Sequence, residues 1–164
     1  MIKHKVIARH KLVKTRGRLH ALLIKNCVDV ALDCLGADAP CEVSVLITGD
    51  RIVQKINKEF RGIDRTTDVL SFPMHEFSIP GWTRRMRHET DPESGLIPLG
   101  EIVLSAEKVA RQARKFRHSL EQETAYLTIH SVLHLLGYDH MDAARKKQMR
   151  AYENLIMREL GFLK

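Results

Sequence analysis

The stretch HSVLHLLGYDH, residues 130–140, contains the helix around which we expect this fold to be built. His130 and His134 are four residues apart, so on a helix they share one face, one turn apart. Gly137 can adopt the positive φ that ends a helix, which lets the chain turn back and bring His140 towards the other two rings. Three nitrogen ligands with a fourth position left for water are typical of a catalytic zinc site. We therefore expect one Zn²⁺ per chain, bound by His130, His134 and His140.

Two features of the same stretch narrow the chemistry. A single histidine on an apolar helix face is usually a core residue, but three buried imidazoles would each need a polar partner, which favours a shared metal. The residue after His130 is Ser131, so the chain lacks the His-Glu-x-x-His pattern in which the glutamate of a zinc peptidase acts as general base. Peptide hydrolysis by that mechanism is disfavoured, whereas reactions that need a polarised water or a neutralised anion remain open.

Hydrophobic periodicity outside this stretch predicts alternating strands and helices. Strands are expected over residues 2–8, 42–48 and 68–73 and around Ile102 and Leu104. Helices are expected over residues 16–35, after a cap at Asp50, and from Ser105 or Ala106 to Phe116. Two more helices are expected, one from a cap at Ser119 through His134 and one from a cap at Asp142 to Gly161. The order β-α-β-α-β-β-α-α-α indicates an α+β fold in which a small mixed sheet packs against helices, with the metal-binding helix near the centre. We expect residues 1–164 to form one domain. Residues 74–98 show no periodicity and are expected to form a long, mobile, functional loop.

Composition places the chain among globular proteins of a reducing compartment. Hydrophobic residues make up 44% and charged residues 29% of the 164 residues, no apolar run is long enough to span a bilayer, and no secretory signal is visible. The three cysteines, Cys27, Cys34 and Cys41, are odd in number and form no Cys-x-x-Cys pair, which argues against a disulfide framework. We expect a cytoplasmic protein, or an organellar one if the source is a eukaryote, without a membrane partner.

Basic residues are concentrated in two places. Residues 1–20 hold seven basic and no acidic residues, which accounts for the formal net charge of +7. Such an arm favours an anionic partner, nucleic acid first, although a solubilising surface or a targeting peptide would also be basic. In the 74–98 loop, Arg84, Arg85 and Arg87 lie near Trp82. This cluster could stack on and hold single-stranded RNA, or it could be a solvated surface.

Two aspartates are candidates for orienting the metal ligands. Asp68 is the first residue of the strand predicted at 68–73, and Asp139 stands next to His140. Either carboxylate could accept a hydrogen bond from a histidine N–H and so fix the ring, or could simply form a turn.

The histidine stretch resembles the YbeY family of endoribonucleases, whose signature runs His-Gly-x-Leu-His-Leu-x-Gly-Tyr-Asp-His. This chain matches every specified position of it except Ser131, where the family usually has Gly. Two further blocks agree in family order: Asn57, Arg61, Gly62 and Asp64 followed by TDVLSFP at 67–73, and LGEI at 99–102, where the family usually has Asp in place of Glu101.

The resemblance implies a zinc-dependent endoribonuclease that prefers single-stranded RNA. It also implies a role in maturing the 3′ end of small-subunit (16S-type) ribosomal RNA and in ribosome quality control, with ribosomal RNA and the small subunit as partners. Arg61 is implied as a functional residue that lines the cleft beside the metal. A guanidinium fork suits a phosphate, which it can hold bidentately while charge grows in the transition state.

Two other functions remain compatible with the residues. One is a non-catalytic, zinc-containing RNA-binding factor in ribosome assembly, which a closed site with four protein ligands would favour. The other is a metal-dependent hydrolase of another substrate class, against which the basic arm and the missing His-Glu pair argue.

Overall fold

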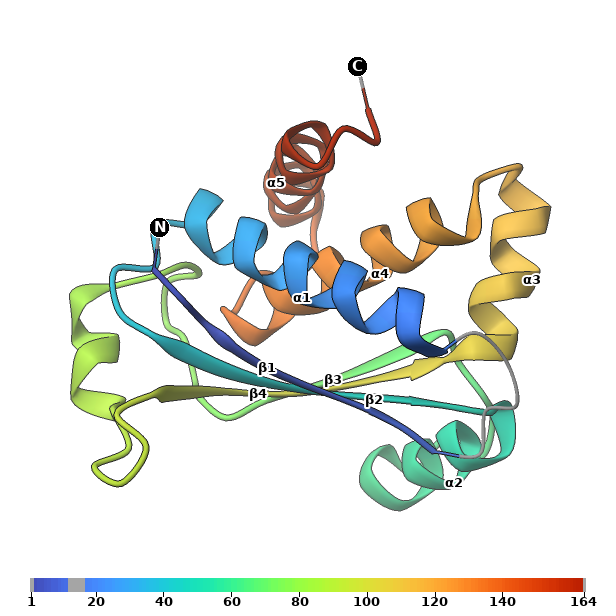
Figure 1. The fold of residues 1–164 in the computed structure, drawn as a ribbon, viewed down its shortest axis with the longest axis horizontal. Helices are drawn as coiled ribbons and strands as arrows, with labels where there is room; N and C mark the ends of the chain where they lie inside the picture. Colours follow the sequence, from blue (N-terminus) through green and yellow to red (C-terminus); the bar gives the residue numbers. More distant parts are fainter. Residues whose placement is uncertain (1, 12–16, 164) are drawn as a thin grey trace.

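A four-stranded mixed sheet lies between helices in the computed structural model of this chain, which describes residues 2–11 and 17–163 (Figure 1). The elements are β1 (Lys5–His10), α1 (Gly17–Cys34), β2 (Cys41–Thr48), α2 (Asp50–Arg61), β3 (Val69–Pro73), the short 3₁₀ helix η1 (Arg84–Glu89), β4 (Ile97–Ser105), α3 (Ala106–Phe116), α4 (Leu120–Leu135) and α5 (Ala143–Glu159). The strand order is β1-β2-β4-β3, with β1, β2 and β4 parallel and β3 antiparallel to β4. The predicted α+β class and the predicted order of strands and long helices are confirmed.

The main core lies between one face of the sheet and helices α1 and α4, with α5 packed on the outer side of these helices (Figure 1). On β2, alternate residues Val43, Val45 and Ile47 are buried against this layer, as the period of a half-covered strand requires. Helix α4 is buried on most of its surface, since it contacts the sheet and other helices on several sides. This burial fixes the direction in which its histidines can point, because only its remaining side faces solvent.

Among the described helices, α2 is the one that covers the other face of the sheet (Figure 1). A second, smaller core lies there, made by Val53, Leu70 and Val103 with Leu46, Ile56 and Phe72 at its margin. Helix α2 ends at Arg61 and is followed by Gly62, whose φ of 70° forms a left-handed cap.

A bulge in β4 places Gly100 against the neighbouring strand. The register between β2 and β4 shifts at Glu42/Val43, and Gly100 has a φ of 140°. A Cβ at this position would lie 2.2 Å from the carbonyl oxygen of Phe72 on β3. The LGEI block therefore needs glycine for the close approach of two backbones.

The predicted cap of α2 needs correction. Asp50 is the first residue of α2 rather than its cap: the cap position is Gly49, and the backbone N–H of Asp50 donates to Glu107 of α3 at 2.8 Å. The Asp50 carboxylate is occupied elsewhere, because it accepts hydrogen bonds from Thr66, Ser105 and Arg111.

The 74–98 segment contains more regular structure than the predicted loop. It contains η1 and the first two residues of β4, and it buries Met86 in the main core. The Trp82 indole N–H donates to Asp38 at 2.8 Å, and Arg87 holds the same carboxylate with two of its nitrogens. These contacts attach the segment to the turn between α1 and β2. They could not be predicted from the sequence, because the segment has no hydrophobic periodicity. The helices of the described ranges include none that is long and apolar enough to cross a membrane.

Candidate metal centre

The end of α4 brings the three histidines together. His130 and His134 lie one turn apart on α4, which ends at Leu135. Gly137 has a φ of 82°, and the N–H of Tyr138 donates to the Leu133 carbonyl, so the chain reverses direction here as predicted. A Cβ on residue 137 would lie 2.5 Å from the Cβ of Phe77, so glycine is needed here for space as well as for its φ.

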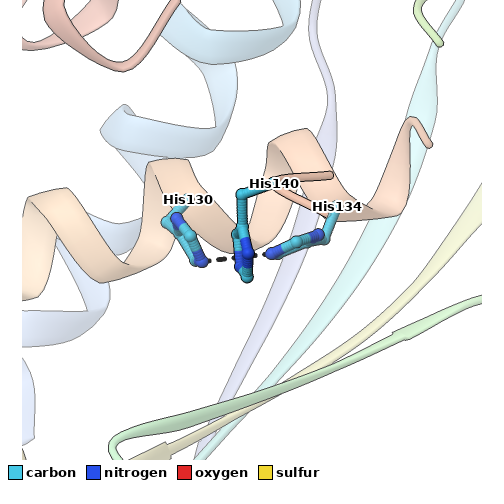
Figure 2. A group of neighbouring side chains, drawn as sticks. All are labelled: His130, His134 and His140. Atoms are coloured by element: carbon cyan, nitrogen blue, oxygen red, sulfur yellow. Dashed lines mark hydrogen bonds between the residues drawn. The ribbon is translucent and has the colours of Figure 1, made fainter. Parts of the chain in front are cut away.

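The ring nitrogens converge on one point (Figure 2). One nitrogen from each of His130, His134 and His140 lies within 4.8 Å of the others, and the Nε2 atoms of His130 and His134 are 3.1 Å apart. Two nitrogens that share a tetrahedral zinc at about 2.0–2.1 Å would lie about 3.3 Å apart, so this spacing fits a shared ion. His130 and His134 are half-buried and His140 is exposed, which leaves the cluster open on one side.

A buried carboxylate that the sequence reasoning missed orients His130. Glu153 of α5 is 3% exposed, and its Oε1 lies 2.7 Å from Nδ1 of His130. With the proton on Nδ1 donated to Glu153, Nε2 keeps its lone pair for a metal, as is usual for metal-binding histidines. The signal was a glutamate at an apolar position of α5, since Glu153 lies between the buried residues Met149 and Ile156.

Burial determines the protonation state of a second ring. Burial first, and then the neighbouring rings of His130 and His140, lower the pKa of His134 to about 4. His134 is therefore neutral near pH 7, the form in which imidazole binds metal.

The two aspartates predicted as possible partners of the histidines make other contacts. Asp68 accepts hydrogen bonds from Thr67, the Val69 N–H and Gln112. Asp139 accepts from the N–H of Met141 and pairs with Arg145 at 2.8 Å. Asp139 thus forms the turn that presents His140, which was the alternative considered for it.

Arg61 lies at the end of α2, in a different hollow from the histidines. Its Nη2 donates to the Ser71 carbonyl at 3.0 Å, and its guanidinium carbon lies 5.6 Å from the centroid of the Phe72 ring. The hollow has a volume of about 420 Å³ and is also lined by Lys108 and Gln112, whereas His130 and His140 border a smaller one of about 50 Å³. Arg61 is exposed and makes no ion pair in the described part of the chain, so its guanidinium is available to a ligand.

The two basic clusters predicted to bind RNA differ in how many of their side chains are held by other protein groups. Trp82 and Arg87 are held by Asp38, which leaves Arg84 and Arg85 as the cations of the loop cluster that make no ion pair in the described part of the chain. In the basic N-terminal stretch, residues 5–10 form strand β1 and Lys5 pairs with Glu42 at 2.7 Å. Lys14 and Arg16 lie outside the described residues, as does the side chain of Arg18.

Two further histidines, His75 and His118, belong to other parts of the fold. His118 lies 3.1 Å from the buried carboxylate of Glu123, and Nε2 of His75 lies 2.6 Å from the Pro98 carbonyl oxygen. Neither joins the cluster of three, which accords with the metal site expected at His130, His134 and His140.

Comparison with known proteins identifies related chains. A sequence model of the family described as Endoribonuclease YbeY matches residues 7–161. The chain is 46% identical over 120 residues to Endoribonuclease YbeY of Caldicellulosiruptor bescii, covering 73% of each chain. It is 41% identical over 139 residues to Endoribonuclease YbeY of Caldicellulosiruptor saccharolyticus, covering 85% of each. Its fold is similar to the solution structure of TM1509 from Thermotoga maritima, with a TM-score of 0.57 and 24% identity over 96% of this chain and 91% of that one.

Proposed function

Because this chain belongs to the YbeY family of endoribonucleases, we propose that it cleaves single-stranded RNA at the three-histidine centre with one bound zinc ion. We further propose that it acts in the maturation of the small-subunit ribosomal RNA 3′ end and in ribosome quality control, and that it binds the small ribosomal subunit. The observation that carries the catalytic proposal is the convergence of three histidine nitrogens on one open point. In the described residues this cluster has three members, which supports a catalytic site over a closed structural one with four protein ligands.

The chain's own residues have separable roles in this proposal. RNA carries its own nucleophile, the 2′-OH, so the protein has to position the phosphate and offset its charge. When bound, the ion supplies a Lewis acid beside a phosphate oxygen. Glu153 holds the His130 ring in the tautomer that leaves Nε2 free, and burial keeps His134 neutral. Imidazole also suits other transition metals, so zinc is the proposed ion on the basis of ligand type and number.

Arg61 is proposed as the group that holds a phosphate of the substrate. Support comes from its exposed guanidinium, anchored at one nitrogen by the Ser71 carbonyl and placed over Phe72. Arg61→Ala should slow RNA cleavage at least about tenfold, as expected for the loss of a charged phosphate contact, while melting temperature and metal content stay unchanged. Arg51→Ala, an exposed cation of the same helix, is the matched control. Loss of folding in the Arg61 variant would make its role structural.

Cleavage of a labelled single-stranded RNA by purified protein tests the main proposal. Activity should be lost on metal removal, should return with zinc, and should be absent from His134→Ala at any zinc concentration. His118→Ala is the control, because His118 lies against Glu123 and outside the cluster. Full activity of the metal-stripped protein, or of His134→Ala, would refute the proposal. Binding of the full chain to isolated small ribosomal subunits tests the proposed partner.

A further inference from the structure

Helix α5 presents one of its faces to the candidate metal centre. Lys146, Met149, Arg150 and Glu153 have the spacing i, i+3, i+4 and i+7, which places them along one stripe of a helix. All four line the small hollow of about 50 Å³ that is also bordered by His130 and His140. The stripe is therefore a wall of the space beside the histidines.

This wall is divided into a buried and an exposed half. Met149 and Glu153 are 2% and 3% exposed and form the inner half, where Glu153 contacts His130. Lys146 and Arg150 are exposed and form the rim. Nη1 of Arg150 donates to the Tyr126 hydroxyl at 3.3 Å and lies 3.6 Å from Oε2 of Glu153, so this guanidinium is anchored next to the carboxylate that orients His130.

The rim has an excess of positive charge. Glu153 partly balances Arg150, but its other oxygen already accepts the hydrogen bond from His130. The nearby acids Asp139 and Asp142 both pair with Arg145. In the described part of the chain the Lys146 ammonium makes no ion pair. It can therefore bind an anion without first breaking a salt bridge. A cation bound by the histidines would add to this positive field.

We propose that Lys146 and Arg150 form a phosphate-binding subsite for the RNA substrate, on the α5 side of the metal centre. They hold a backbone phosphate next to the one that reacts, Lys146 as a mobile point charge and Arg150 as a guanidinium already fixed in place. This subsite rests on the proposed endoribonuclease function and adds a binding wall to it. Unlike Arg61, these two cations border the same hollow as His130 and His140.

Adjacent lysines on α5 provide a matched test. Lys146→Ala and Lys147→Ala remove the same charge from neighbouring exposed positions of one helix, but Lys147 lies about a quarter turn away and does not line the hollow. The measurement is the affinity of the zinc-reconstituted protein for a single-stranded RNA with 2′-O-methyl sugars, which cannot be cleaved through a 2′-OH, at several salt concentrations. Loss of one phosphate contact should flatten the slope of log affinity against log salt by about 0.7, which is about a fivefold loss of affinity at 0.1 M salt.

We expect Lys146→Ala to show this loss and Lys147→Ala to bind like the unmodified protein. Arg150→Ala should weaken binding in the same way, and its zinc content, measured in parallel, should remain one per chain. Equal affinities and slopes for the two lysine variants would overturn the subsite, even with the unmodified protein active as a nuclease. If the unmodified protein cleaves no RNA with any metal, the proposed function fails. The cleavage assay decides this outcome, independently of the comparison between the two lysine variants.

Discussion

Replacement of Glu153 by Gln should weaken metal binding without unfolding the protein. The 2.7 Å contact between Oε1 and Nδ1 of His130 is a charge-assisted hydrogen bond, buried with Glu153 at 3% exposure. Gln keeps the shape and an acceptor oxygen but removes the charge that makes the His130 ring a better ligand. Loss of such a partner typically lowers metal affinity by about 10–100-fold, or about 1.4–2.7 kcal/mol.

The assay is zinc affinity at pH 7.5, measured by competition with a chelating indicator, with the melting temperature of the metal-free protein recorded beside it. Glu123→Gln is the control, because Glu123 is also 3% exposed and also contacts a histidine, His118, but lies outside the cluster. We expect a large loss of affinity for Glu153→Gln and none for Glu123→Gln. Equal zinc affinities of Glu153→Gln and the unmodified protein would refute the argument that Glu153 tunes the centre through His130.

Three further changes test other parts of the structure. Gly137→Ala should destabilise the protein by more than about 1 kcal/mol in urea unfolding, because φ is 82° and the new Cβ would meet Phe77 at 2.5 Å; a neutral result would contradict this account of the turn. Ser131→Ala should raise the melting temperature, because the buried Ser131 hydroxyl has no hydrogen-bond partner among the described residues, at a cost of about 1–3 kcal/mol; a lower melting temperature would count against it. Burial lowers the pKa of His4 below 6.5, and Nδ1 of His4 accepts a hydrogen bond from the Cys41 N–H. Below about pH 6.5 the unfolded chain therefore binds more protons at His4 than the folded chain does, so the stability that neutral His4 contributes is lost as pH falls. His4→Asn should therefore lose less unfolding free energy than the unmodified protein between pH 7.5 and 5.5, and equal losses would exclude His4 as the cause.

Local periodicity was enough to predict most of the secondary structure. The alternation of Val43, Val45 and Ile47 and the caps at Ser119 and Asp142 depend on residues a few positions apart, and the structure has each of them. The His130–His134 spacing and the turn at Gly137 are likewise local, so convergence of these rings with His140 could be expected before any tertiary structure was known.

Contacts between distant segments could not be predicted in this way. The pairing of Glu153 with His130 spans 23 residues, and that of Trp82 with Asp38 spans 44. Nothing in the pattern of either segment specifies its partner, because the helical and strand periods describe which side of an element is buried, not what covers it.

The sequence by itself thus determined which elements form and which three histidines meet, because an i, i+4 pair and a glycine turn act within a few residues. Only the tertiary structure decided that β4 lies between β2 and β3, that α5 brings Glu153, Lys146 and Arg150 to the histidines, and that Arg61 borders a separate hollow. The physical reason is that these placements follow from how whole faces pack. The free energy of such packing is shared among many side chains along the chain, so no short motif records it.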